Sequence, residues 1–339
     1  MNICLKALAS IFAFELLIGC GGGGGNNTPA AAVKEKPIEV VELLEINNKT
    51  NKVFDNSMRL GSFSAILTAY QNGVSQGALP DVVPTFMATG ENKVVLFDAR
   101  ERIAQFVAGY KSSHGTTPER AFIADDIFWD AYTLPVPLDN EIKFSYANLK
   151  ELIAVWRAIT PDTKLIIAGA PGVMMNPHST KYAREIGNSV DEVAYFTYQA
   201  LDIGVDANIY FEGDAMKNIV NLPECKDQAV TGHFIIDGIE CASLLVPGKV
   251  GIVYQAFLNR DEANDPIKLA ERTAQLISNW DDMKTVGNFL KSRDRLSFVV
   301  PFGFYWSEQQ RASEPGLIGG ISFMNENTLG KLRESLLFN

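Results

Sequence analysis

The strongest constraint on this chain is the regular alternation of short apolar runs with amphipathic helical segments. Eight runs rich in valine, isoleucine, leucine and phenylalanine are expected to form β-strands: residues 58–63, 93–98, 121–126, 164–168, 207–212, 250–257, 296–302 and 317–324. Helical periodicity is expected over residues 99–111, 146–159, 190–201, 267–290 and 327–337, and a short strand or helix over residues 38–44. Apolar runs without polar alternation are typical of parallel strands that are covered on both faces.

Eight such strands separated by helices predict an α/β fold, a single TIM-like (β/α)8 barrel. A doubly wound open sheet is the main alternative, but the Gly-x-Gly-x-x-Gly motif of its dinucleotide-binding version follows no early strand. The barrel is expected to span residues 57–339, with an elaborated loop over residues 213–249 near its mouth. Of the 339 residues 47% are hydrophobic, which is enough for one large core, and the net charge of −10 disfavours binding to nucleic acid.

Residues 1–19 have the features of an export signal, a lysine followed by a short apolar stretch. Their last residues, Leu17-Ile18-Gly19, form with Cys20 a sequence that resembles the lipobox of bacterial lipoproteins. The resemblance implies cleavage before Cys20 and acylation of its sulfur. The five glycines that follow begin a flexible tether, expected to extend to residue 56. We therefore expect a lipid-anchored protein of the bacterial cell envelope, in the outer membrane and facing the periplasm or the exterior. The alternative is an ordinary secretory signal in which Cys20 is incidental.

The remaining cysteines fit an exported protein. Cys4 leaves with the signal, so Cys225 and Cys241 remain as a pair that encloses 15 residues. An oxidising compartment allows them to form a disulfide, which would stabilise the fold by about 3 kcal/mol in a loop-closure estimate. Two buried free thiols are the alternative. A zinc site is not expected, because His233 is the one additional soft ligand in this segment.

Polar and aromatic side chains are concentrated where the expected strands end, which in a parallel barrel is where reacting groups gather. These residues are Asp98, Asp125, Asp126, Trp129, Glu212, Tyr254, Gln255, Tyr305 and Trp306. Two carboxylates beside a glycosidic bond can act as acid and base or as acid and nucleophile, and aromatic rings offer flat surfaces to sugars. The pattern predicts a carbohydrate site with Asp125, Asp126 and Glu212 as the catalytic candidates and the others as substrate-binding candidates. Adjacent strand residues face opposite sides, so we expect only one of Asp125 and Asp126 to point inward.

Three segments support this interpretation by resemblance. Residues Gly204–Glu212 resemble the glycine-aspartate-strand-glutamate segment of barrel glycoside hydrolases, including the chitinase-like ones. Val253-Tyr254-Gln255 resembles their sixth strand and Gly319–Met324 their last strand. The resemblance implies that Glu212 is the general acid. We expect Glu212 to donate the proton, with Asp125 or Asp126 as its partner carboxylate, in a hydrolase that acts on a polysaccharide or glycan without a cofactor.

Two other functions remain open. The first is a non-catalytic glycan-binding lipoprotein, since Asn208 and Tyr210 stand where the chitinase-like pattern has aspartates. The second is a metal-dependent phosphodiesterase, in which Asp98, Asp126 and Glu212 would bind magnesium or calcium. The chain has no paired-histidine motif and no Gly-x-Ser-x-Gly motif, which argues against a zinc hydrolase and a serine esterase.

Overall fold

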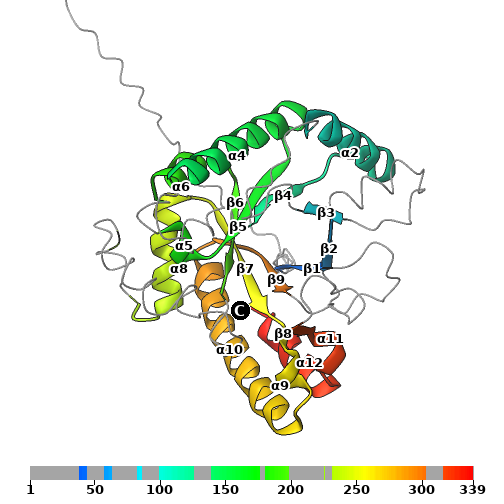
Figure 1. Cartoon of the computed structure of the whole chain (residues 1–339), viewed down its shortest axis with the longest axis vertical. Coiled ribbons are helices and arrows are strands. Elements are labelled where there is room, and N and C mark those ends of the chain that lie inside the picture. Colours follow the sequence, from blue (N-terminus) through cyan, green and yellow to red (C-terminus); the bar gives the residue numbers. More distant parts are fainter. Residues whose placement is uncertain are drawn as a thin grey trace, which may run out of the picture. The chain divides into compact units, whose positions relative to one another are not determined.

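Eight parallel strands form one closed sheet in the computed structural model, which describes residues 38–43, 57–62, 82–85, 99–125, 139–175, 180–197, 225, 231–302 and 316–338. The strands are β1 (Glu39–Leu43), β2 (Ser57–Ser62), β3 (Val82–Thr85), β4 (Arg120–Asp125), β5 (Lys164–Gly169), β6 (Glu192–Phe196), β7 (Lys249–Gln255) and β9 (Leu296–Phe302). The hydrogen-bonded order is β3-β2-β1-β9-β7-β6-β5-β4, and β3 also contacts β4. Each strand therefore lies between two others, in chain order, which defines a (β/α)8 barrel (Figure 1).

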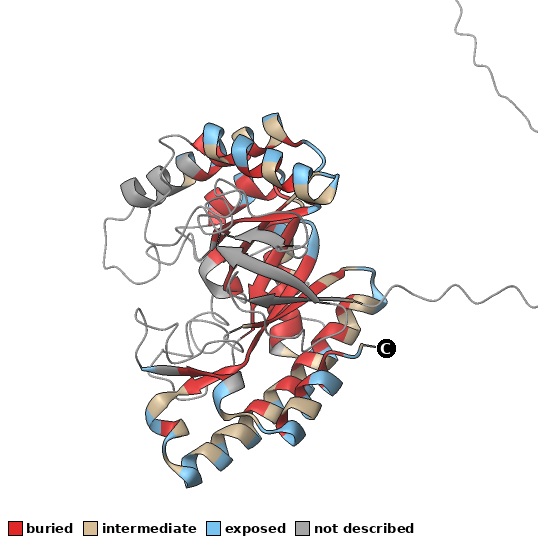
Figure 2. Cartoon of the chain, turned by 90° about the vertical axis from the view of Figure 1, so that its right-hand side faces the viewer, coloured by how far each residue is buried: buried red, intermediate tan, exposed pale blue. Residues whose placement is uncertain are grey.

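From β3 onward, the described helices lie between successive strands and pack on the outside of the barrel. The long ones are α2 (Ala99–His114), α4 (Asp139–Ile159), α6 (Thr180–Gly187), α8 (Phe234–Leu245), α10 (Pro266–Ser292) and α12 (Glu326–Ser335). Helix α10 begins at a typical cap, where the Asp265 carboxylate accepts the main-chain N–H groups of Ile267 and Lys268. Figure 2 shows the buried residues on the strands and on the helix faces that meet them, with the exposed residues on the outer helix faces.

The strand side chains belong to two separate apolar groups. Alternate residues of β7, such as Ile252 and Tyr254, join the helices in the main core. Buried apolar side chains on the opposite strand faces fill the barrel interior: Phe122, Ile166, Ala168, Ala194, Phe196, Val253, Phe298 and Val300. Phe122 and Phe298 meet across this interior with ring centroids 5.5 Å apart. Gly251 makes room for them, because a Cβ at that position would lie 2.2 Å from the Phe298 ring.

A buried polar group lies near the amino-terminal ends of the strands. The Arg120 Nε atom donates to the Glu192 carboxylate at 3.1 Å, and the Ser297 hydroxyl donates to the same carboxylate at 2.8 Å. The Arg120 Nη2 atom also donates to the Ser297 hydroxyl at 3.3 Å, which completes a triangle. The side chains of Arg120 and Glu192 are 7% and 3% exposed. The triangle therefore joins β4, β6 and β9 at the end of the barrel opposite its mouth.

The structure confirms the barrel and much of its predicted element order. Strands β2, β4, β5, β7 and β9 lie where the apolar runs predicted strands, and helices α2, α4, α10 and α12 lie where the periodicity predicted helices. The undecided segment over residues 38–44 is strand β1, so the barrel begins before the predicted boundary at residue 57. Residues Pro37–Asn339 accordingly form one compact unit.

Other predicted elements require correction. The helix predicted over residues 190–201 is wrong, because residues Glu192–Phe196 form the fully buried strand β6. The last predicted strand, over residues 317–324, is not part of the barrel. Its first residues form β10 (Leu317–Gly319), which pairs antiparallel with the short strand β8 (Phe257–Asn259), and α11 (Gly320–Phe323) follows directly.

The remaining predictions concern segments that the structure describes only in part. Strand β3 was not expected, and the strand predicted over residues 93–98 lies outside the described residues. Residues 207–212 also lie outside them, but β6 pairs directly with β7, so the eight-stranded sheet is complete without a strand there. Within the loop predicted over residues 213–249, helix α8 occupies residues 234–245.

The buried triangle gives a stability prediction. Glu192→Gln removes the buried carboxylate that pairs with Arg120 and leaves only the exposed Glu119 carboxylate, 3.7 Å from Arg120 Nη2, so we expect the free energy of unfolding to fall by about 3 kcal/mol. Urea titration followed by circular dichroism measures this change. Replacing Arg120 and Glu192 together by methionine should cost less than Glu192→Gln alone, because no buried charge is left unpaired. An unchanged stability of Glu192→Gln would contradict the predicted role of the triangle.

Candidate functional site

The candidate site lies at the carboxyl-terminal end of the barrel. All eight strands run in one direction, so their last residues and the loops that follow them meet at one end. Among the described residues, Asp125 ends β4, Thr197 follows β6, Gln255 ends β7 and Phe302 ends β9. These positions bring together one carboxylate residue, neutral polar residues and an aromatic ring.

Gln255 has an unusual hydrogen-bonding state for a buried residue. It is 4% exposed, and its side-chain Nε2 atom donates to the main-chain oxygen of Phe257 at 3.2 Å. Its Oε1 atom is buried and has no hydrogen-bond partner within the described part of the chain. A buried acceptor without a donor costs about 1–3 kcal/mol unless a water or a ligand supplies the donor.

The main chain around Gln255 is held from several sides. The Trp280 indole, buried on α10, donates to the Gln255 carbonyl oxygen at 2.9 Å. The Ala256 N–H donates to the Phe302 carbonyl oxygen at 2.9 Å, and the Ala256 carbonyl oxygen accepts the Gly320 N–H at 2.9 Å. These bonds, with the β8–β10 pairing, tie together the segments that follow β7 and β9.

Aromatic rings lie beside Gln255 on the same face of the sheet. Phe302 is in register with Gln255 and is partly exposed. Its ring centroid lies 6.2 Å from that of Phe196 and 6.2 Å from that of Phe257, and both of these neighbours are buried. The sequence interpretation did not single out Phe302, although its two-residue spacing from Phe298 and Val300 on the interior face would have identified it.

Tyr254, a predicted substrate-binding residue, is a core residue instead. It belongs to the outward face of β7, is fully buried in the main core, and its hydroxyl lies 3.5 Å from the carbonyl oxygen of Ser335 in α12. Burial raises the pKa of this hydroxyl well above its usual value. The alternation of strand residues explains the correction, since Gln255 and Tyr254 must face opposite sides.

The register of β4 indicates which position at its end is aligned with the barrel interior. The β4–β5 pairing shifts between Phe122 and Ala124, so that Asp125 is in register with Ala168. Ala168 belongs to the interior group of side chains. This irregularity therefore moves position 125, and not position 124, into line with the barrel interior.

The other candidates cannot be placed. Asp98, Asp126, Trp129, Glu212, Tyr305 and Trp306 lie outside the described residues. Glu212 belongs to the segment between β6 and α8, and Tyr305 and Trp306 follow β9. Among the described residues no group of three or more histidine, cysteine, aspartate or glutamate side chains has the arrangement of a metal site. In the same residues, no helix has the length and apolar content needed to cross a membrane.

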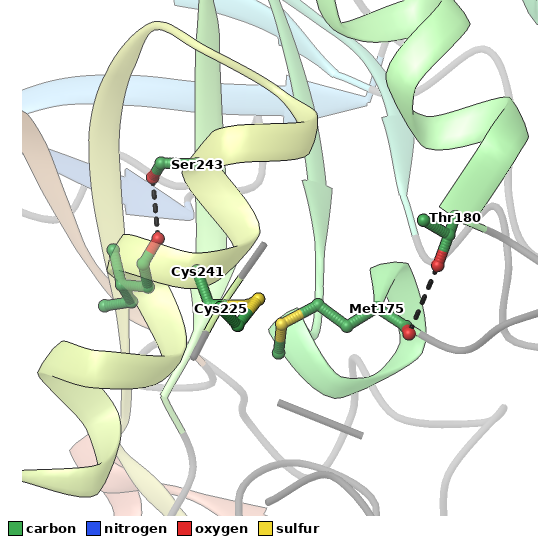
Figure 3. Close-up of a disulfide and its surroundings, with 6 residues drawn as sticks. Met175, Thr180, Cys225, Cys241 and Ser243 are labelled. Carbon is green, nitrogen blue, oxygen red and sulfur yellow. Dashed lines mark hydrogen bonds between the residues drawn. A yellow bond between two sulfur atoms is a disulfide. The ribbon is translucent and has the colours of Figure 1, made fainter. Parts of the chain in front are cut away.

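Cys225 and Cys241 form a disulfide, as the sequence predicted, with Cα atoms 5.2 Å apart. Both cysteines are buried, and Cys241 belongs to α8. Figure 3 shows the Met175 side chain pointing toward this disulfide, while the Met175 carbonyl oxygen accepts a hydrogen bond from the Thr180 hydroxyl at the start of α6. The bridge thus fixes Cys225, in the β6–α8 connection, to the helix layer beside the end of β5.

Comparison with solved structures supports the barrel. An intracellular xylanase from Thermoanaerobacterium saccharolyticum, bound to xylotriose, has a TM-score of 0.51 at 9% identity, over 88% of this chain and 96% of the xylanase. A thermostable mutant of a xylanase from Cellvibrio japonicus has a TM-score of 0.50 at 11% identity, over 89% and 97% of the two chains. No protein-family model and no curated protein matches the sequence. The chain therefore has a (β/α)8 barrel fold like that of these xylanases, and the comparisons give no support to the chitinase-like resemblance.

The indole bond at Gln255 gives a second stability prediction, with a matched control in the same protein. Trp280→Phe and Trp156→Phe shorten two equally buried side chains, but the Trp156 Nε1 atom has no hydrogen-bond partner among the described residues. Trp280→Phe should therefore lower the free energy of unfolding by about 1–3 kcal/mol more than Trp156→Phe. Urea titrations of both variants measure the difference, and equal losses would show that the indole bond contributes nothing.

Proposed function

We propose that this protein is a glycoside hydrolase that cleaves a polysaccharide by carboxylate acid–base chemistry at the carboxyl-terminal end of its barrel. The observation that carries the proposal is the register of Asp125, which aligns it with the interior at that end. The xylanases with the same fold support a polysaccharide substrate, since one of them is bound to xylotriose. Carboxylates on both sides of the scissile bond would supply the proton donor and its partner.

Glu212 is the proposed proton donor, and Asp125 the proposed partner. Glu212 lies in the segment between β6 and α8, which starts at the carboxyl-terminal end of β6. Enclosure of its carboxyl group beside substrate would raise its pKa and keep it protonated near neutral pH. Asp125 is favoured over Asp126 because its strand partner, Ala168, faces the interior. Asp98, Trp129, Tyr305 and Trp306 are proposed to contact the sugar chain.

Substitution of the carboxylates tests the chemistry. Release of reducing ends from neutral polysaccharides, with xylan first, measures activity. Glu212→Gln and Asp125→Asn should each lower kcat by about 100-fold or more, because each removes a group that transfers a proton or stabilises charge in the transition state. Asp126→Asn is the matched control and should lower kcat by less than about 10-fold. Full activity of Glu212→Gln would reject the proposed donor, and greater loss in Asp126→Asn than in Asp125→Asn would reverse the choice between the aspartates.

A non-catalytic glycan-binding protein is the second candidate. It is favoured by the neutral character of the other described strand ends, since neither Gln255 nor Thr197 can act as acid or base at neutral pH. This function predicts binding of oligosaccharides by calorimetry without release of reducing ends. Hydrolysis that depends on Glu212 would exclude it.

We also propose that the barrel is tethered to the outer membrane of a bacterial cell through acylated Cys20. The proposal is supported by the lipobox-like sequence, the glycine-rich segment after it, and the disulfide, which fits an oxidising compartment. Cys20→Ser should move the protein from the membrane fraction to the soluble fraction and abolish labelling by a fatty-acid probe. Labelling that persists in Cys20→Ser would contradict this anchor.

A further inference from the structure

We propose that Gln255 and Phe302 form a binding position for a neutral sugar ring. In this arrangement the Gln255 Oε1 atom accepts a hydrogen bond from a sugar hydroxyl, and the Phe302 ring packs against the sugar's C–H face. The inference rests on the proposed function and deepens it, because it names the atoms that recognise the substrate and the chemical class that they select.

The first argument is the state of the Gln255 amide. Its Nε2 atom donates to the Phe257 carbonyl oxygen at 3.2 Å. Rotating the side-chain amide by half a turn would therefore place the Gln255 Oε1 atom against the Phe257 oxygen, and two acceptors would face each other. The buried Oε1 atom is therefore fixed as an acceptor without a partner within the described residues. Only a group that carries a hydrogen can satisfy it, and a sugar hydroxyl is such a group.

The second argument is the position of this acceptor. Gln255 is the last residue of β7, and it is on the interior face because it alternates with Val253 and Gly251. The Trp280 indole holds its carbonyl oxygen, so the backbone that carries the acceptor is fixed. Trp280 is therefore a positioning residue for this binding position and does not itself contact the sugar.

The third argument is the neighbouring ring. Phe302 is the register partner of Gln255 on the adjacent strand, where paired backbones lie about 4.8 Å apart. Phe257 packs against it in a T-shaped arrangement with an interplanar angle of 77°, which holds the ring orientation. An acceptor and a partly exposed aromatic ring at paired positions of adjacent strands match one sugar ring, which presents hydroxyls at its edge and C–H groups on its face.

The chemical class follows from charge. Among the described residues, those that end β6, β7 and β9 carry no charged side chain. A uronic acid carboxylate would meet an acceptor oxygen and none of these described strand-end residues would supply a cation, which is unfavourable when the groups are removed from water. We therefore infer that this position selects a neutral sugar over an acidic one.

The test is calorimetric binding to the full chain, with xylopentaose and cellopentaose as neutral probes and pentagalacturonate as the acidic probe of matched length. Gln255→Met keeps the side-chain volume and removes the acceptor, and we expect it to weaken binding of the tighter neutral probe about 10-fold. Phe302→Leu should weaken the same binding, because it removes the flat ring. Gln275→Met is the matched control, since the Gln275 Oε1 atom accepts from Arg272 within the same helix, α10.

Thermal unfolding with and without the tighter neutral probe separates binding from stability. Gln255→Met also removes the Nε2 donor to the Phe257 carbonyl oxygen, so its Tm without sugar should fall. The probe should raise the Tm of Gln255→Met by less than it raises the Tm of the unchanged protein, and an equal rise would overturn the assignment.

The outcomes separate this inference from the proposed function. Binding of a neutral probe with the same affinity in Gln255→Met overturns the binding position alone. Tighter binding of pentagalacturonate than of both neutral probes overturns the chemical class. Failure of all three probes to bind, together with no hydrolysis of polysaccharides, overturns the proposed function and this inference with it.

Discussion

Closure of the sheet is the constraint on which the rest of the structure depends. Because β9 pairs with β1 and β3 meets β4, each strand has a neighbour on either side, and its side chains alternate between the helix layer and a closed interior. Parallel pairing then places all carboxyl-terminal ends at one end of the barrel. The functional end is thus a consequence of strand direction. The residues that reach it are the last ones in each strand whose positions face the barrel interior.

Burial of the strands on both faces explains which sequence-based predictions succeeded. The apolar runs that became β4, β5, β7 and β9 are easily recognised, because strands buried on both faces need apolar residues at nearly every position. Residues 190–201 were predicted to be helical because a short apolar run fits a helix as well as a buried strand, and only pairing with β5 and β7 decides between them. Helix α8 was missed inside the predicted loop, although Asp237, Glu240 and Ser243 recur at the three-residue spacing of one helix face.

The candidate site was predictable in kind but not in detail. Choosing polar residues at the ends of the predicted strands correctly placed Asp125 and Gln255 at the carboxyl-terminal end of the barrel. The same choice included Tyr254, which faces the main core because side chains alternate along the strand. The irregularity in β4 cannot be seen in the sequence, and without it position 124 would align with the interior in place of Asp125. Likewise, the bond from the Trp280 indole to Gln255 joins residues 25 positions apart through tertiary packing alone.

The two ends of the barrel differ in how their buried polar groups are hydrogen-bonded. At the amino-terminal end, Arg120, Glu192 and Ser297 hydrogen-bond to one another, so that neither buried charge is left unpaired. At the carboxyl-terminal end, the Trp280 indole holds the Gln255 carbonyl oxygen, while no described residue donates to the Gln255 side-chain oxygen. The difference is what binding requires, because an acceptor already paired within the protein would gain nothing from a sugar hydroxyl.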